Sequence, residues 1–416
     1  MLRELFFAFA WFFAALTFAI SIGVPNGYGI GTSLLFLSSA SLLYLKPRWS
    51  DLDEDDKRLV YAFLAFGLSM FAFIYIDDFR VRDLDRPSRF ILVIPVMLLL
   101  LQSKNHKVWL WYGVVIGAIL AFALAWYERE VLGYGRAKGG EHPIMFGDTG
   151  MMLGMLSFVA STFFLTHKRY VWLTLSLLGA LCGIGASVLS ASRGGWVALP
   201  LIGIFLFWQC RFLVNKKTWV VTAITSVSLL VAVVLISQTG VKQRINETIE
   251  NVIKYDNGIN KESSIGLRFE MWKAAFYMFE DSPVLGAGKH SSVVEKNRFL
   301  EEGLIIPAAL KYGHAHNEYI NALGYRGIVG LAFLLIVYLV PLRLFLKKMN
   351  QYKDNWNIKS YAMAGALVPM CYMDFGLSQV MFAHNIGVMM YAFPIVYFWA
   401  AVRWAEKEEL AKSTAS

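Results

Sequence analysis

The chain has 416 residues, of which 57% are hydrophobic and only 17% are charged, and its mean hydropathy is +0.51. Soluble domains contain about 45–50% apolar and about 25% charged residues, so this composition excludes an ordinary soluble enzyme and indicates a membrane protein. We attribute the net charge of +9 to basic loops on one side of a membrane and not to a nucleic-acid partner. The three cysteines fall within or at the edge of apolar runs, which favours neither a disulfide framework nor a cysteine metal site.

Apolar runs long enough to cross a bilayer recur along the chain, and we predict about twelve helical spans. The first follows Arg3 and shows no clear small-residue cleavage site before Pro25, so we predict a retained helix. The fourth is short, which suits a tilted or half-buried helix. The predicted spans are Leu5–Ile22, Ile30–Leu45, Leu59–Ile76, Phe90–Gln102, Val108–Trp126, Ile144–Thr166, Val171–Leu189, Trp196–Trp208, Trp219–Ile236, Ile328–Phe345, Tyr361–Asp374 and Phe382–Trp404.

Lysine and arginine gather in alternate loops, which predicts that these loops and both termini are cytoplasmic. The long segment Ser237–Gly327 then lies on the outer side. No internal repeat or proline-rich linker divides the sequence, so we predict one membrane domain over residues 1–416 with an external loop over 237–327. The basic loops carry Lys46, Arg48, Lys57, Arg58, Lys104, Lys107, Lys168, Arg169, Arg211, Lys216, Lys217, Arg343, Lys347, Lys348 and Lys353.

The first candidate site is the run Ser190-Ala-Ser-Arg-Gly-Gly195, at the predicted outer end of the seventh span. It places Arg193 at the interface among small residues, Ser192 included, that let a ligand approach the backbone. Arginine binds phosphate oxygens with a bidentate fork, so Arg193 is a candidate phosphate ligand. The alternative is an arginine that extends its charged group from a helix end into the interface.

The second candidate is Arg268, in the first turn of a helix that Ser264 is predicted to cap and that runs to about Phe279. The free N–H groups and the dipole of a helix N-terminus favour anions, and an arginine adds a full positive charge. The alternative is a solvated helix face on which Arg268 pairs with Glu270 or Glu280.

The third candidate is the run His314-Ala-His316-Asn317-Glu-Tyr. Histidines at i and i+2 do not share a helix face, and no carboxylate or cysteine lies at a zinc-ligand spacing, so we predict no metal site. Imidazole titrates near neutral pH, which makes a general base the better functional interpretation. A pair of ordinary loop histidines is the alternative.

Other ionisable residues fall on the predicted outer side. Arginines alternate with aspartates in the loop from Asp77 to Arg89, which favours a self-neutralised loop. Asp148, Asp374 and His384 lie near the ends of predicted spans, where they either face a cavity or sit at the interface.

The pattern of His316-Asn317, nine residues and Gly327-Ile-Val-Gly330 resembles the motif of the O-antigen ligases and of the wider O-antigen ligase/polymerase superfamily. The family pattern usually continues with Thr or Val, and this chain has Leu331, a conservative departure. The Ser-Arg-Gly run around Arg193 resembles the first essential arginine of the family. The family's loop arginine, aromatic residue and Pro/Gly-rich turn are matched by Arg268, Trp272, Pro283, Gly286 and Gly288.

This resemblance implies an all-α, GT-C-like polytopic membrane enzyme with a large helical periplasmic loop. It implies metal-independent, inverting transfer of a glycan from undecaprenyl pyrophosphate to a terminal sugar of lipid A–core, at the periplasmic face of a Gram-negative inner membrane. Arg193 and Arg268 would bind the pyrophosphate, and His316 would deprotonate the acceptor hydroxyl. No cofactor is expected, since the lipid-linked donor is itself a substrate. The remaining expected substrate ligands are Ser192, His314 and Asn317.

Two other functions fit the same residues. An O-antigen polymerase or a protein O-oligosaccharyltransferase shares the superfamily motif, but oligosaccharyltransferases often carry extra external C-terminal sequence, whereas only the short segment Arg403–Ser416 follows the last span here. A transporter or lipid-glycan flippase would show internal repeats and charges near the bilayer centre, whereas the ionisable residues here gather at the outer boundary.

Overall fold

The structure is a computed structural model that describes residues 2–103, 106–192, 194–197, 199–215, 217 and 250–415. Throughout these residues it is helical, with no strand, as the sequence predicts. The chain divides into two compact units, which we call unit 1 (residues 1–199 and 330–416) and unit 2 (residues 200–329).

Seven of the described helices are long and apolar enough to cross a membrane, and they confirm a polytopic helical membrane protein. The count of about twelve spans stays a prediction, and the predicted span Trp219–Ile236 lies outside the described residues. The fourth span is longer than predicted, because its helix begins at Asp85 and not at Phe90. The seven candidate spans are Gly27–Leu45, Glu54–Ile76, Trp109–Val131, Pro143–Thr166, Tyr170–Leu189, Glu318–Gln351 and Asn385–Thr414.

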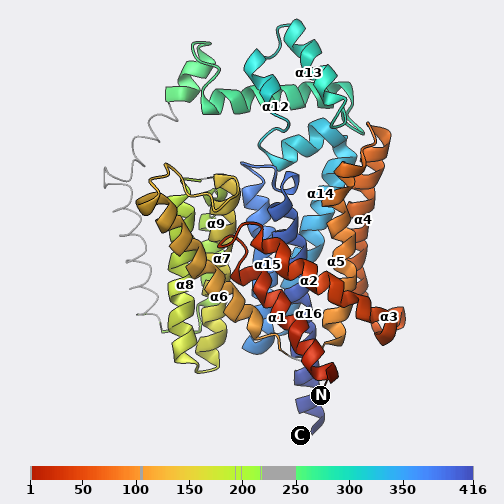
Figure 1. The fold of residues 1–416 in the computed structure, drawn as a ribbon, viewed down its shortest axis with the longest axis vertical. Helices are drawn as coiled ribbons and strands as arrows, with labels where there is room; N and C mark the ends of the chain where they lie inside the picture. The colour runs from red at the N-terminus through yellow and green to blue at the C-terminus, as the bar shows by residue number, and fades with distance from the viewer. Residues whose placement is uncertain are drawn as a thin grey trace. The chain divides into compact units, whose positions relative to one another are not determined.

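Unit 1 is a bundle in which the last helix, α16, is the most buried, with 94% of its apolar window inside the protein. It packs against α15 and α5, while α6, α7 and α8 pack against one another as a group (Figure 1). The helices of unit 1 are α1 (Leu2–Ala19), α2 (Gly27–Ser38), α3 (Leu42–Leu45), α4 (Glu54–Ile76), α5 (Asp85–Gln102), α6 (Trp109–Trp126), α7 (Pro143–Thr166), α8 (Tyr170–Leu189), the later part of α14 (Glu318–Gln351), α15 (Trp356–Phe375) and α16 (Asn385–Ala415).

Small residues bring α7 and α8 into close contact. A Cβ atom added at Gly183 of α8 would lie 2.4 Å from the Cα atom of Gly154 in α7, and one added at Gly179 would lie 3.1 Å from the Ser157 hydroxyl. Close approach through small side chains is the usual basis of helix association in a bilayer, where lipid is as apolar as leucine. The glycines therefore fix the α7–α8 pair that precedes the Ser190–Gly195 run.

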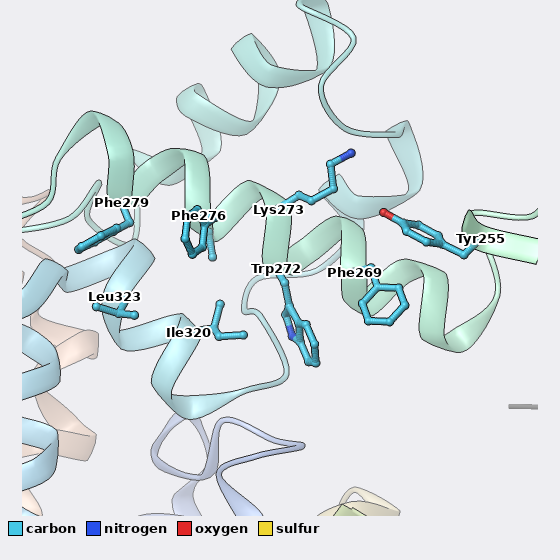
Figure 2. A pocket seen from close by; sticks show the side chains of 9 residues that line it. Tyr255, Phe269, Trp272, Lys273, Phe276, Phe279, Ile320 and Leu323 are labelled. Atoms are coloured by element: carbon cyan, nitrogen blue, oxygen red, sulfur yellow. The ribbon is translucent and has the colours of Figure 1, made fainter. Parts of the chain in front are cut away.

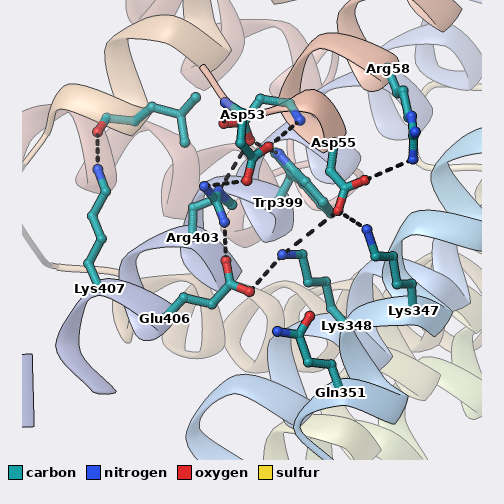
Figure 3. Close-up of polar contacts among 12 residues, drawn as sticks. Asp53, Asp55, Arg58, Lys347, Lys348, Gln351, Trp399, Arg403, Glu406 and Lys407 are labelled. Carbon is teal, nitrogen blue, oxygen red and sulfur yellow. Dashed lines mark hydrogen bonds and ion pairs between the residues drawn. The ribbon is translucent and has the colours of Figure 1, made fainter. Parts of the chain in front are cut away.

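A network of charged residues joins α4, α14 and α16 at one end of unit 1 (Figure 3). Asp55 accepts a hydrogen bond from Lys347 at 2.6 Å, and the Lys348 ammonium lies 2.7 Å from Glu406 and 3.9 Å from Asp55. The network brings the predicted basic loops around residues 46–58 and 343–353 to the same end of the unit, although the side of the membrane that they face stays a prediction. Arg403 adds ion pairs with Asp53, Asp56 and Glu406.

Replacing Lys348 by methionine should lower the free energy of unfolding by about 2 kcal/mol, because Glu406 keeps Arg403 and Asp55 keeps Lys347 but both lose the buried cation that they share. Their side chains are only 9% and 8% exposed. Thermal unfolding in detergent measures the effect. The matched control is Lys353→Met, since Lys353 is exposed and forms no ion pair within the described part of the chain. Equal midpoints for the two variants would contradict the assigned role.

Unit 2 contains α9 (Leu199–Cys210) from Pro200 onward, α12 (Ser264–Asp281), α13 (Ser292–Glu301) and the first part of α14. Its core forms where α12 packs against α13 and the short helix Pro307–Lys311. Apolar residues fill this core: Ala274, Ala275, Met278, Phe299, Ile305, Ala309, Ala315 and Tyr325. The three turns that carry His316, Gly286 and Gly327 are built around it.

Candidate active site

The His314–His316 turn lies directly before α14 and has an unusual backbone. His316 has φ 47°, in the left-handed region that side chains other than glycine and asparagine seldom adopt. Its backbone N–H donates to Nδ1 of His314 at 3.3 Å, and the two imidazole centroids are 4.3 Å apart. Such strain persists only where surrounding contacts hold it and gathers at functional sites. The strained backbone therefore marks this turn as a candidate functional site.

Two asparagines hold this turn. The Asn317 side-chain oxygen accepts from the N–H groups of Tyr319 and Ile320, both at 3.0 Å, and so caps the first turn of α14. The Asn321 side-chain oxygen accepts from the buried N–H of Ala315 at 3.1 Å. Asn317 thus has a structural role beside its predicted role in substrate binding, which stays a prediction. The role of Asn321 was not predicted from the sequence, although Asn321 lies one helical turn after Asn317 and so on the same helix face.

Helix α12 begins one residue earlier than predicted. Ser263, and not Ser264, is the cap, and its hydroxyl accepts from the Gly266 N–H at 3.0 Å. Arg268 therefore lies in the second turn of the helix and not in the first. The end of the helix agrees better with the prediction, at Asp281 against about Phe279.

Arg268 is half-buried, and burial lowers the pKa of its guanidinium. The predicted alternative, an ion pair with Glu270 or Glu280, is absent, because no carboxylate among the described residues pairs with Arg268. An arginine stays protonated at neutral pH despite such a shift. A half-buried cation without a protein counterion is a physical basis for anion binding.

Glu270 has a different set of partners. Its carboxylate is fully buried and accepts from the Tyr255 hydroxyl at 2.7 Å, from the Ile306 N–H at 3.0 Å and from Lys273 at 3.4 Å. Burial and this hydrogen bond raise the pKa of Tyr255. Glu270 thereby ties α12 to the segments before and after it and leaves Arg268 uncompensated.

Trp272 connects α12 to the histidine turn. Its indole N–H donates to the Ala315 carbonyl at 2.8 Å, directly before His316. Residues four apart share a helix face, so Trp272 lies on the same face as Arg268. The structure thus places Arg268 and the His314–Asn317 turn on neighbouring elements of one compact unit.

The predicted Pro/Gly turn after α12 is joined to the Gly-x-x-Gly motif by backbone hydrogen bonds. The Ala287 and Gly288 N–H groups donate to the carbonyls of Gly324 and Tyr325 at 3.0 and 3.1 Å. In return, the Ile328 N–H donates to the Pro283 carbonyl at 2.9 Å. Gly286 and Gly327 lie where these two segments meet, and both have a positive φ, which glycine adopts readily. Gly327 also forms the kink that divides α14. Gly327 of the motif and Gly286 therefore have a structural reason independent of substrate.

Replacing Gly327 by alanine should destabilise unit 2 by more than the roughly 1–3 kcal/mol of backbone strain. The backbone has φ 61° and ψ −164°, and a Cβ atom would lie 2.3 Å from the Val284 carbonyl carbon. Purified yield and thermal midpoint measure the effect. Gly313→Ala is the control, because no atom lies within 4 Å of its added Cβ. Wild-type stability of Gly327→Ala would show that the close contact is not needed.

The Ser190–Gly195 run belongs to unit 1, and Arg193 lies outside the described residues. Ser192 is buried, and its hydroxyl donates to the Asp148 carboxylate at 3.4 Å. A Cβ atom added at Gly195 would lie 2.7 Å from Asp148, and one added at Gly194 would lie 1.8 Å from the Ser378 hydroxyl. Protein neighbours therefore occupy the space that a Cβ atom at either glycine would take, and the approach of a ligand to this backbone stays a prediction.

The remaining residues that were predicted to lie on the outer side form polar contacts in unit 1. Arg86 and Arg89 contact Asn385, each at 3.4 Å, and Arg89 also pairs with Asp85 at 2.8 Å. The self-neutralised loop predicted from the sequence is thus present in part, since Arg80 pairs with Asp78 as well. Burial and the nearby Arg136 lower the pKa of His142, whose ring lies 6.4 Å from that of His384.

Comparison with known proteins supports the resemblance drawn from the motifs. Residues 178–335 match the model of the family described as O-antigen ligase, and this range contains Ser192, Arg268, the histidine turn and both glycines of the Gly-x-x-Gly motif. An uncharacterized protein of Haemophilus influenzae is 27% identical over 381 residues, which cover 91% of this chain and 94% of that protein.

An O-antigen ligase of Escherichia coli K12 is 24% identical over 246 residues, which cover 57% of this chain and 56% of that protein. The matches support an O-antigen ligase-type function and therefore a glycosyltransferase-type enzyme. The family match over residues 178–335 and the named relative thus make the chain similar to the O-antigen ligases.

Proposed function

We propose that the protein transfers a glycan from undecaprenyl pyrophosphate to a terminal sugar of lipid A–core, with inversion at the anomeric carbon. One observation carries the proposal: the strained His316 turn is bonded, through Trp272, to the helix that presents the uncompensated Arg268. A base for the acceptor and a cation for the leaving group are the two groups that this reaction needs.

His316 is the base in this mechanism. It takes the proton of the acceptor hydroxyl while the acceptor oxygen forms a bond to the anomeric carbon. The bond between that carbon and the pyrophosphate oxygen breaks, and its electron pair leaves with undecaprenyl pyrophosphate. Attack from the face opposite the leaving group inverts the configuration, as in inverting glycosidases. His314 positions His316, because its Nδ1 accepts the backbone N–H of His316.

Arg268 and Arg193 bind the pyrophosphate in this mechanism. The leaving group is already a stable anion, so the reaction needs charge stabilisation and no general acid. Two guanidinium groups can supply that charge through paired hydrogen bonds to phosphate oxygens, which is why we propose a metal-independent reaction. Ser192 and Asn317 are proposed as further substrate ligands beside their structural bonds.

The proposed reaction takes place at the periplasmic face of the inner membrane, with both chain termini in the cytoplasm. Support comes from the loop charges, since the basic loops alternate with the loops that carry the proposed site. No ATP is available outside the cell, and the pyrophosphate bond of the donor supplies the driving force.

The test uses the purified full-length protein in detergent with EDTA, lipid A–core and a synthetic undecaprenyl-pyrophosphate-linked glycan. Transfer to lipid A–core by the wild type, followed as a ladder on a gel, is the expected result. Glycan that lengthens only on the polyprenyl carrier would instead identify a polymerase, and transfer only to a protein acceptor an oligosaccharyltransferase. No transfer in any of these assays, with glycan-lipid movement across vesicles, would favour a transporter.

A further inference from the structure

Unit 2 contains an apolar groove of about 420 Å³ beside the proposed site (Figure 2). Trp272 and Phe276 of α12 face Ile320 and Leu323 of α14 across it. The volume lies within the range of about 300–1,000 Å³ typical of small-molecule sites, and the groove is open on one side. The lining is completed by Tyr255, Phe269, Lys273, Ala275 and Phe279.

One face of α12 carries a positively charged residue that is followed, toward the C-terminal end of the helix, by aromatic residues. Arg268, Trp272, Phe276 and Phe279 follow one another at spacings of four, four and three residues, which places them on one helix face. A half-buried cation that pairs with no carboxylate among the described residues therefore lies at one end of a row of aromatic rings. A ligand that complements this face has an anionic head and an apolar chain.

The opposite wall begins at the proposed base. Ile320 and Leu323 belong to the first turns of α14, which start directly after His316 and are capped by Asn317. Both walls of the groove thus extend from the residues that are proposed to act at the anomeric carbon and at the diphosphate of the donor. Phe276 is 57% exposed, an unfavourable arrangement for a large apolar side chain unless an apolar ligand covers it.

We propose that this groove binds the isoprene units of the donor nearest the diphosphate, so that α12 recognises both the anionic head and the start of the lipid chain. The inference rests on the proposed function, since it takes the lipid-linked donor as the substrate. It adds a lipid-binding role for Trp272, Phe276, Phe279, Ile320 and Leu323. The volume accommodates a short stretch of chain, so the first isoprene units and not the whole polyprenyl group determine recognition.

The kinetic test compares donors that carry the same glycan on a C55 chain or on a single C5 isoprene unit. For Phe276→Ser with the C55 donor, KM should rise about tenfold, because apolar contact with the chain is lost. With the C5 donor, which reaches only the start of the groove, the rise should be at most about twofold. The KM for lipid A–core should stay unchanged.

Val293→Ser is the matched control, because Val293 is 58% exposed on α13 and does not line the groove. It should leave the KM of both donors unchanged. An equal rise of KM for the C55 and C5 donors in Phe276→Ser would overturn the proposal, as would an unchanged KM for the C55 donor.

Photolabelling separates this inference from the proposed function, because it needs no turnover. A C55 diphosphate with a diazirine on its first isoprene unit should label peptides within 269–279 and 320–323 of the wild-type protein in nanodiscs. A diazirine phospholipid should label them at least tenfold less. Equal labelling by the phospholipid would identify the bilayer as the occupant and overturn the proposal, whereas specific labelling without glycan transfer would leave the groove assigned and reject the ligase reaction.

Discussion

Replacing His316 by asparagine should lower kcat for glycan transfer by about 10²- to 10⁴-fold, the usual contribution of a positioned general base. Asparagine tolerates the left-handed backbone that His316 adopts at φ 47°, so the turn should keep its shape. The acceptor hydroxyl would then lack a proton acceptor, while the groups proposed to bind the pyrophosphate stay in place. Steady-state kinetics in detergent measure kcat and the KM of each substrate.

His290→Asn is the control for the removal of an imidazole from the same unit at a position outside the proposed site. It should leave kcat within about twofold of the wild type, as surface substitutions usually do. A kcat for His316→Asn close to that of the wild type would exclude His316 as the base. A loss confined to KM would assign it a binding role.

Replacing Arg268 by alanine should lower kcat/KM for the donor by about 10²- to 10³-fold, comparable with the loss of one group that stabilises developing charge. Within the part of the chain that the structure describes, no carboxylate pairs with Arg268, so its charge is available to an anion. Arg268→Lys should recover only part of the activity, because an ammonium cannot form the bidentate fork. The KM for lipid A–core should change little, since Arg268 is proposed to contact the donor.

The matched control is Arg298→Ala. Arg298 belongs to the same unit but already pairs with Asp281, Glu295 and Glu302, so its charge is neutralised within the protein. Its loss should change kcat/KM by less than about threefold, in line with the small energies of exposed ion pairs. Similar losses for Arg268→Ala and Arg298→Ala would show that unit 2 responds to any lost cation and that Arg268 has no special role.

The helical fold and the grouping of candidate residues could be predicted from local patterns. Apolar runs of bilayer length found most of the helices, and capping and proline signals found α12 to within one residue at its start and two at its end. The motif spacing directed attention to Arg268, His314, His316 and Asn317, all of which the structure places in unit 2. These signals are contained in contiguous sequence, so they need no knowledge of tertiary contacts.

The partners of Glu270, Gly194 and Gly195 could not be predicted, because they come from segments that are far apart in the sequence. An ion pair of Arg268 with Glu270 or Glu280 was the alternative offered by the sequence, but the Glu270 carboxylate accepts from Tyr255 and the Ile306 N–H. The close packing of Gly194 against Ser378 and of Gly195 against Asp148 was also not predicted. Partners that are tens or hundreds of residues away leave no periodic or local signal in a single sequence.

The structural role of the Gly-x-x-Gly motif also could not be predicted from the sequence. Its spacing from His316 identified the family resemblance, yet the role of Gly327 in the kink of α14 follows only from its contact with Val284. The apolar groove was also unpredicted, because its two walls come from α12 and α14.

Arg268 is proposed to bind the donor, and His316 is proposed to activate the acceptor. Equilibrium binding of an undecaprenyl-pyrophosphate-linked glycan to the wild type, Arg268→Ala and His316→Asn tests this proposal most directly, with transfer assayed on the same samples. We expect that His316→Asn binds the donor like the wild type but transfers it at least about 10²-fold more slowly, whereas Arg268→Ala binds it at least about tenfold more weakly. Equal loss of donor binding in both variants would contradict the account, because His316 would then be a donor ligand and not the base.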